Sequence, residues 1–223
     1  MSKKTKLFLY LGIVAVILRN SFVYGIGWYR PQYSHTSDFI SELSAEGAPG
    51  AGLINFFSLI LVGIFIILGG IGLKSYFLKP GIQMSSIYLI TGGIGYIIIG
   101  LFPCPPGCNM ETDTFQMTLH LLGAFIATLS MVLSALLYGL WYFKGHPTVL
   151  RLSAFTLGCV GFLAFTALWI MFFYLAMNKS IIYEPIGGLV QRLNVAAGDL
   201  WLFLACLFAL RNEKRTPQKP GEL

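Results

Sequence analysis

Long apolar runs separated by short polar segments dominate the pattern of this chain. A run of about 20 apolar residues is long enough to cross a ~30 Å hydrocarbon core as an α-helix. Six such runs can be read, at approximately 7–28, 53–73, 84–102, 117–143, 152–177 and 189–210. Lipid-facing β-barrel strands need only ~9–11 residues and alternate apolar with polar positions, which these runs do not. The pattern therefore predicts an all-α fold, a bundle of six transmembrane helices within residues 1–211.

The composition agrees with a membrane protein. Of the 223 residues, 56% are hydrophobic and only 11% are charged, whereas soluble domains carry roughly 25% charged residues. The first run contains Arg19 and lacks an early small-residue cleavage site, so we expect a retained helix and not a signal peptide. The segment 212–223 is charged and contains proline, and we expect it to be a disordered cytoplasmic tail.

The basic residues predict the orientation, because positive charge is retained in the cytoplasm. An even number of spans places both termini on one side, and most cations fall on that side. They are Lys3, Lys4, Lys6, Lys74, Lys79, Lys144, Arg151, Arg211, Lys214, Arg215 and Lys219. We therefore expect cytoplasmic termini in a cell inner or plasma membrane. The net charge of +6 then indicates contact with membrane lipids and no nucleic-acid partner, and nothing in the pattern indicates an oligomeric state.

One densely polar segment, HTSDFISELS, follows the first run at His35–Ser44, and we call it the polar island. His35, Asp38 and Glu42 stand at i, i+3 and i+7, so a helix would carry all three side chains on one face. The hydroxyl groups of Ser37 and Ser41 flank Asp38. On the predicted topology the polar island lies outside the cytoplasm.

The topology collects further polar residues in the same layer. His120 lies in the first turn of the fourth run, and Gln191 and Arg192 open the sixth. The guanidinium of Arg192 would suit a phosphate or carboxylate group of a ligand. The candidates for ligand binding are Ser37, Ser41, Gln191 and Arg192.

These polar residues leave three interpretations open. Carboxylates with a histidine can act as acid and base, and the catalytic candidates are His35, Asp38, Glu42 and His120. A divalent metal is possible with the same residue types, and it would use His35, Asp38 and His120; no other cofactor is indicated. Because no HExxH or GxSxG motif is present, the side chains could instead be helix caps. Whether the protein is an enzyme therefore stays open.

The segment CPPGC at 104–108 places two cysteines in an expected extracytoplasmic loop. An oxidising compartment favours a short disulfide between Cys104 and Cys108. A metal pair completed by His120 is the alternative, although the spacing matches known metal motifs loosely. Cys159 and Cys206 lie in apolar runs and are expected to be small core residues.

Two charges, Arg19 and Asp199, lie deep within the apolar runs. At 1.5 Å per helical residue, each is roughly 18–20 Å from the basic edge, counted from Lys6 and Arg211. An unpaired charge in hydrocarbon costs on the order of 3 kcal/mol or more. We therefore expect the first and sixth helices to be neighbours and Arg19 and Asp199 to form an ion pair. This pair would either fix the helix packing or floor a polar cavity that opens outward.

Four segments of the chain are similar to a known family. They are YSHTSDFISELSAEGAPGAGLIN after the first run, GLFPC at 100–104, His120, and GLVQR at 188–192. Together they resemble the prokaryotic membrane proteins grouped as domain of unknown function 998, which implies six helices and no particular reaction. The element ISELSAEGAP is also, more faintly, similar to the six-helix Frag1/DRAM-like membrane proteins, which implies a lipid-related role by analogy.

The sequence thus favours an inner-membrane protein with a polar, acidic extracytoplasmic pocket. Such a pocket would bind, and in an enzymatic version modify, a lipid headgroup or a small amphiphile. The competing class is a non-enzymatic transport, assembly or structural membrane protein, whose polar residues are helix caps and packing pairs.

Overall fold

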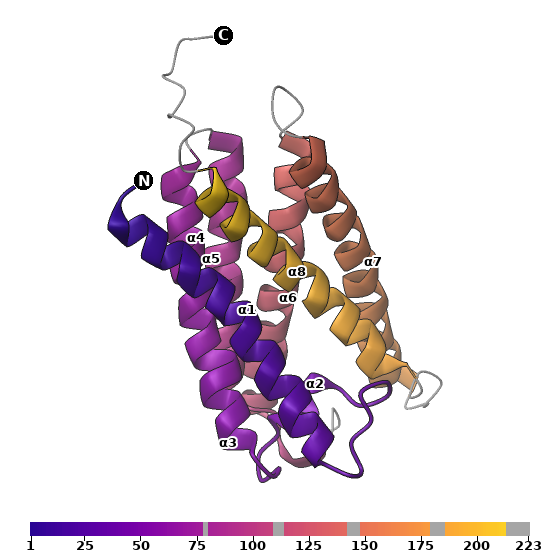
Figure 1. Ribbon diagram of the computed structural model, residues 1–223. Helices are drawn as coiled ribbons and strands as arrows, with labels where there is room; N and C mark the ends of the chain where they lie inside the picture. Colours follow the sequence, from indigo (N-terminus) through magenta and orange to yellow (C-terminus); the bar gives the residue numbers. More distant parts are fainter. Residues whose placement is uncertain (78–79, 109–113, 142–147, 179–185, 213–223) are drawn as a thin grey trace.

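Six long helices run side by side, and short elements fill one end of the molecule (Figure 1). The structure, a computed structural model, describes residues 1–77, 80–108, 114–141, 148–178 and 186–212. The long helices are α1 (Lys3–Tyr29), α4 (Leu61–Tyr76), α5 (Pro80–Leu101), α6 (Phe115–Trp141), α7 (Thr148–Asn178) and α8 (Gly187–Arg211). The described residues contain no strand, and six helices are long and apolar enough to span a membrane. The prediction of an all-α, multi-pass membrane protein is confirmed.

The second span is not a uniform α-helix. The short helix α3 (Ala51–Leu53) leads into a π-helix, η1 (Ile54–Ile60), which continues directly into α4. Together they form one candidate span, Ala51–Tyr76. A π-helical turn widens the helix locally and is frequent at functional sites. Two more short elements, α2 (Ile40–Leu43) and the 3₁₀ turn η2 (Pro106–Cys108), lie in the connections.

The helix ends follow local capping chemistry. The hydroxyl oxygen of Ser2 accepts a hydrogen bond from the backbone N–H of Thr5 at 3.0 Å, so α1 begins at Lys3, a turn before its apolar run. Pro80 opens α5, a position where the missing N–H of proline leaves no bond unmade. Of the expected disordered tail, 212–223, residues 213–223 lie outside the described residues.

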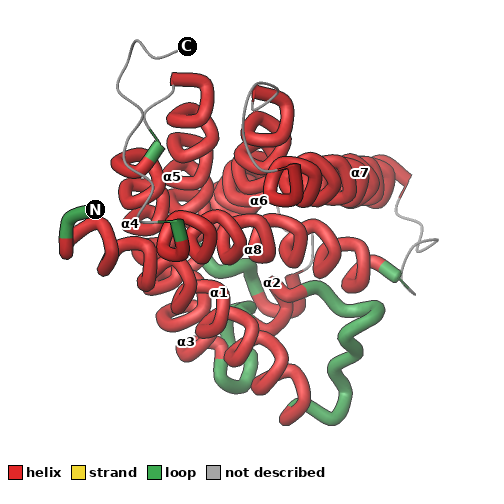
Figure 2. Tube along the Cα trace, turned by 45° about the horizontal axis from the view of Figure 1, so that its top comes forward, coloured by secondary structure: helices red, strands yellow, loops and turns green. Residues whose placement is uncertain are grey.

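The helices pack in sequence order and close into a ring. Each long helix contacts the next one along the chain, and α8 also contacts α1. The first and sixth spans are therefore neighbours, as the buried charges predicted. Figures 1 and 2 show α1 and α8 diverging toward one end, where α2 and its preceding loop lie between them.

Glycines bring several of these helices into close contact. A Cβ atom added to Gly63 would lie 2.6 Å from the carbonyl oxygen of Gly93, and one added to Gly93 would lie 2.6 Å from that of Gly63. Gly95 of α5 faces the backbone of α6 at Ala127. Small residues let transmembrane helices approach closely where no hydrophobic driving force exists between them.

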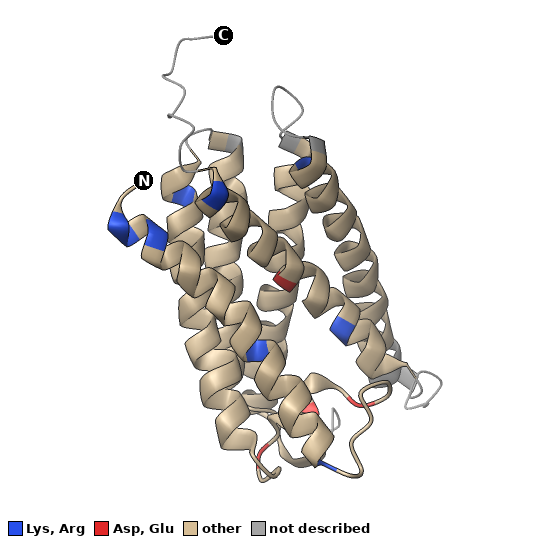
Figure 3. Cartoon of the chain, in the orientation of Figure 1, with Lys and Arg blue, Asp and Glu red and all other residues tan. Residues whose placement is uncertain are grey.

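The two ends of the bundle differ in charge (Figure 3). The basic end is where α1 begins and α8 ends, with Lys3 and Lys4 at the start of α1, Lys74 in the last turn of α4 and Arg211 closing α8. We call the opposite end, with α2 and η2, the loop end. The described chain thus starts and finishes at one end of the bundle.

Candidate functional site

The polar island is not a continuous helix. Only Ile40–Leu43 is helical, and the residues before it form turns. The carboxylate of Asp38 accepts hydrogen bonds from the backbone N–H of Ser34 and the hydroxyl of Ser37, both at 2.8 Å. Such local side-chain bonds compete with helix formation. The expectation that His35, Asp38 and Glu42 share one helical face is therefore wrong.

Glu42 caps the short helix α2. Its Oε1 atom accepts a hydrogen bond from the backbone N–H of Phe39 at 2.9 Å, the backbone-directed half of a capping box. Burial of this side chain raises the pKa of Glu42 above its ordinary value, and the Phe39 N–H opposes that shift. The carboxylate is thus engaged locally, as expected of a cap.

Arg192 fastens the polar island to α8. Its side chain is only 7% exposed, and its Nη1 atom donates to the carbonyl oxygens of Asp38 at 2.8 Å and Gly188 at 3.0 Å. Its Nη2 atom donates to the hydroxyl of Tyr33 and lies 3.3 Å from Nδ1 of His35. Within the described residues, no carboxylate lies at ion-pair distance from Arg192. Both terminal nitrogens of Arg192 already bind the polar island. Arg192 could therefore hold a ligand anion, as expected, only if the anion displaced the island from these nitrogens.

The first turn of α8 is bonded to the same segment. The N–H groups of Gly188 and Leu189 donate to the carbonyl oxygens of Ser37 at 2.9 Å and Thr36 at 2.8 Å, which satisfies two amides that a helix leaves unpaired. The Oε1 atom of Gln191 accepts from the N–H of Ile40 at 2.6 Å. Gln191 is therefore a cap for α2, and the start of α8 is occupied by the chain itself.

The two histidines lie in separate environments. His35 packs against Gly27 of α1 and the ring of Tyr33, and burial, together with the charge of Arg192, lowers the pKa of His35. His120 is buried, with Nδ1 2.9 Å from the carbonyl oxygen of Phe102 at the end of α5.

The three residues of the metal alternative, His35, Asp38 and His120, are not brought together. Among the described residues, no group of three histidine, cysteine, aspartate or glutamate side chains is placed to hold a metal. His35, Asp38 and His120 are thus not gathered, because each is turned toward a different partner: Arg192, the Ser34 turn and the end of α5.

Arg30 was not among the candidates, yet it organises the other side of the island. It follows α1 and donates to the carbonyl oxygens of Glu42 at 3.1 Å, Leu43 at 2.8 Å and Pro49 at 3.0 Å. The sequence did offer one signal for this role, because Arg30 is a single cation between the first span and an acidic loop. Its partners are backbone atoms, which side-chain chemistry in the sequence does not reveal.

A disulfide joins Cys104 and Cys108 around η2. The carbonyl oxygen of Cys104 accepts from the N–H of Glu46 at 2.9 Å, and its sulfur lies 3.3 Å from the carbonyl oxygen of Ser41. The fully buried Cys104 packs with Ala45 and Met117. The CPPGC loop is thus attached to the polar island.

A cleft of about 670 Å³ opens at the loop end between the polar island and the CPPGC loop. Its lining residues are Tyr29, Arg30, Pro31, Gln32, Tyr33, Asp38, Glu42, Ala45, Glu46, Gly47, Ala48, Pro49, Pro106 and Gly107. The lining includes three carboxylates and one guanidinium. Burial raises the pKa of Tyr33 to about 12, so its hydroxyl is neutral at physiological pH. The ligand candidates Ser37, Ser41, Gln191 and Arg192 do not line this cleft.

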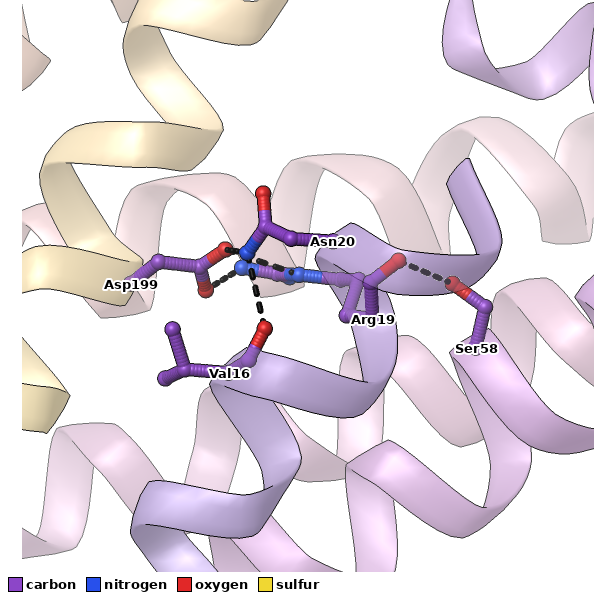
Figure 4. A network of polar contacts seen from close by, with 5 residues as sticks. All are labelled: Val16, Arg19, Asn20, Ser58 and Asp199. Carbon is purple, nitrogen blue, oxygen red and sulfur yellow. Dashed lines mark hydrogen bonds and ion pairs between the residues drawn. The ribbon is translucent and has the colours of Figure 1, made fainter. Parts of the chain in front are cut away.

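The deep charges meet between α1 and α8 (Figure 4). Arg19 and Asp199 are each 3% exposed, and Nε of Arg19 donates to Oδ2 of Asp199 at 3.0 Å. The other carboxylate oxygen forms an ion pair with Nη2 of Arg19. Arg19 and Asp199 are therefore in contact, as we expected because they lie at the same depth in their helices. Neither lines the cleft at the loop end.

Three further residues complete the intramembrane pair. The amide of Asn20 donates to Oδ2 of Asp199 at 3.0 Å. The guanidinium of Arg19 lies 4.5 Å from the ring centroid of Tyr96, a cation–π contact. The hydroxyl of Ser58, in η1, donates to the Arg19 carbonyl oxygen at 3.5 Å. Asn20, a polar residue beside Arg19 in an apolar run, was the signal that could have been read from the sequence.

The comparison with protein families gives one match. The model of a family described as a protein of unknown function, DUF998, matches residues 13–208. The match covers the second to fifth spans completely and most of the first and the last, and the chain belongs to this family. No curated protein and no solved structure matches the chain.

Proposed function

We propose that this protein binds an amphiphile whose cationic headgroup enters the cleft at the loop end, and that this end faces away from the cytoplasm. The charge of the cleft lining supports the proposal most directly. Asp38, Glu42 and Glu46 contribute carboxylates, whereas Arg30 is the one basic residue among the described residues of the lining. Opposite charges attract over several ångströms even at the partly screened surface of a protein.

The hydrogen-bonding state of Arg30 and Glu46 favours a cation over an anion. All the nitrogens of Arg30 already donate to carbonyl oxygens of the island, so a ligand anion would have to compete for them. Glu46 is exposed, and among the described residues its carboxylate has only a long contact, 3.5 Å, with the amide of Gln116. An ammonium group entering the cleft would therefore find an acceptor that is nearly free.

Aromatic residues support an amphiphile rather than a soluble cation. Tyr29 and Tyr33 line the cleft, and aromatic faces attract ammonium groups. Tyr29 is 90% exposed and the neighbouring Trp28 81% exposed. Exposed Trp and Tyr at the end of a span are typical of the membrane interface, so the cleft would lie at the depth of lipid headgroups.

Binding fits the polar groups better than catalysis does. The oxygens of Asp38 accept from Ser34 and Ser37, Oε1 of Glu42 accepts from Phe39, and His120 faces a carbonyl oxygen. These contacts are typical of helix and turn caps. A general base needs an acceptor atom directed at its substrate, whereas these acceptors are directed at the chain itself.

The test compares two amphiphiles with the same tail and opposite charges. The purified protein in a non-ionic detergent is titrated calorimetrically with decyltrimethylammonium and with decyl sulfate. We expect saturable binding of the ammonium compound alone. Replacing Glu46 with Gln should weaken that binding about tenfold, or ~1.4 kcal/mol, while Glu46→Asp should retain most of it. Equal binding of both amphiphiles, or full affinity in Glu46→Gln, would contradict the proposal.

A further inference from the structure

The CPPGC loop forms one wall of the cleft. Pro106 and Gly107 line it and lie between the two bonded cysteines. Ala45 and Glu46 also line the cleft, and the Glu46 N–H donates to the carbonyl oxygen of Cys104 at 2.9 Å. The disulfide therefore closes a short loop whose exposed part faces the cleft and whose buried end holds the polar island.

The backbone of this loop adopts a conformation that one of its residues disfavours. Gly107 has φ = 72°, which glycine tolerates, but Cys108 has φ = 49°, a left-handed value that is unfavourable for a residue with a Cβ atom. Among the described residues, Cys108 is the one non-glycine residue with positive φ. The covalent link to the buried Cys104 restrains Cys108, and a cut link would leave it free to relax.

We propose that the Cys104–Cys108 disulfide is a redox-sensitive clasp on the cleft. A dithiol reductant would attack the half-buried Cys108 sulfur, because Cys104 is fully buried. The S–S bond breaks, the dithiol supplies two electrons and two protons, and the products are two cysteine thiols and the oxidised reductant. Pro106 and Gly107 then move out of the cleft wall, while the six long helices stay packed.

The helices stay packed because the S–S bond joins no two helices, and the packing of Cys104 against Met117 of α6 does not depend on that bond. Cys104 follows the end of α5 and Cys108 precedes α6, so the bond spans only the connection between two helices that already pack along their length. The buried end of the loop is held separately, since the amide of Gln116 donates to the Pro103 carbonyl oxygen at 2.7 Å. The consequence of reduction for ligand binding rests on the proposed function, but the movement of the loop does not.

Hydrogen exchange measured by mass spectrometry, with and without dithiothreitol, tests the movement without any ligand. The Cys108 amide now donates to the Pro105 carbonyl oxygen at 2.8 Å. We expect the peptide that contains residues 104–108 to exchange at least about tenfold faster after reduction, and peptides from α4, α5 and α6 to be unchanged. An unchanged 104–108 peptide, or faster exchange throughout the helices, would overturn the proposal.

The matched control is the double variant Cys104→Ser/Cys108→Ser. It should exchange like the reduced protein and should not respond to dithiothreitol, since Cys159 and Cys206 are already free thiols. Titration with decyltrimethylammonium separates the two proposals. Weaker binding after reduction supports the clasp, and equal binding in both states counts against it. If the oxidised protein does not bind the probe, the proposed function fails, while the exchange experiment still decides the clasp.

Discussion

Individual side chains at the loop end mostly bind backbone. Arg30 and Arg192 together donate to the carbonyl oxygens of Asp38, Glu42, Leu43 and Pro49. Charged hydrogen bonds of this kind are stronger than neutral ones, which suits a connection that lacks long helices of its own. The acidic residues are left to line the cleft or to cap turns.

Glu42 should give the protein a pH-dependent stability. Because burial raises the pKa of Glu42 above 4.5, the folded state holds this proton more tightly than the unfolded state. The resulting stability is fully present below the unfolded pKa and is lost as the pH rises through the folded pKa. We expect the melting temperature of the parent to decrease from pH 4.5 toward neutrality by more than that of Glu42→Gln.

Glu42→Gln is the appropriate variant because its amide oxygen can still accept from the Phe39 N–H. The control is Glu42→Ala, which loses the cap and should be less stable than Glu42→Gln by about 1 kcal/mol at every pH. The interpretation is wrong if the parent and Glu42→Gln show parallel melting temperatures over this range.

At the scale of elements, glycine determines how closely the helices approach. Gly95 of α5 packs against the backbone of α6, where an added Cβ atom would lie 2.5 Å from the N atom and 2.8 Å from the Cα atom of Ala127. Backbone atoms cannot turn aside as a flexible side chain can. The helices would therefore have to separate.

We expect Gly95→Ala to reduce the free energy of unfolding by about 1–3 kcal/mol. The control is Gly25→Ala in α1, where no atom lies within 4 Å of the added Cβ, and where alanine favours the helix by up to ~1 kcal/mol. Thermal unfolding in detergent measures both. Equal melting temperatures for the two variants would show that α5 and α6 leave room for a Cβ atom at position 95.

At the scale of the whole molecule, the ion pair between Arg19 and Asp199 connects the first helix to the last. α1 and α8 are adjacent only in the folded bundle, so this pair, with Asn20, closes the ring of helices. The cleft lies elsewhere, at the loop end. The contacts favour the structural alternative for this pair over the floor of an outward cavity.

Removing one partner of this ion pair should destabilise the protein strongly, whereas removing both partners should be tolerated. Asp199→Leu leaves a buried guanidinium without its partner, so we expect a loss of about 3–5 kcal/mol in stability. The double variant Arg19→Leu/Asp199→Leu should recover most of this loss. Yield and melting temperature in detergent measure the effect. A single variant that melts like the parent, or a double variant no better than the single one, would argue against the pairing.

The sequence by itself determined the six helices and the depth of the two buried charges. Both follow from local rules: apolar runs must satisfy their own backbone in lipid, and the helical rise per residue is constant. The positions of Arg19 and Asp199 could therefore be compared before any contact was known. The basic residues at one end of the bundle were equally visible as a pattern.

Only the tertiary structure decided how the polar island folds and what its charged residues do. The spacing of His35, Asp38 and Glu42 would suit one face of a helix. The hydrogen bonds that Asp38 accepts from the Ser34 N–H and from Arg192, which lies on another helix, keep most of the polar island in turns. A guanidinium can bind a ligand or a carbonyl oxygen equally well. Whether a guanidinium binds a ligand or a carbonyl oxygen depends on residues that are distant in sequence. The cleft is likewise formed by segments that come together only in the folded chain.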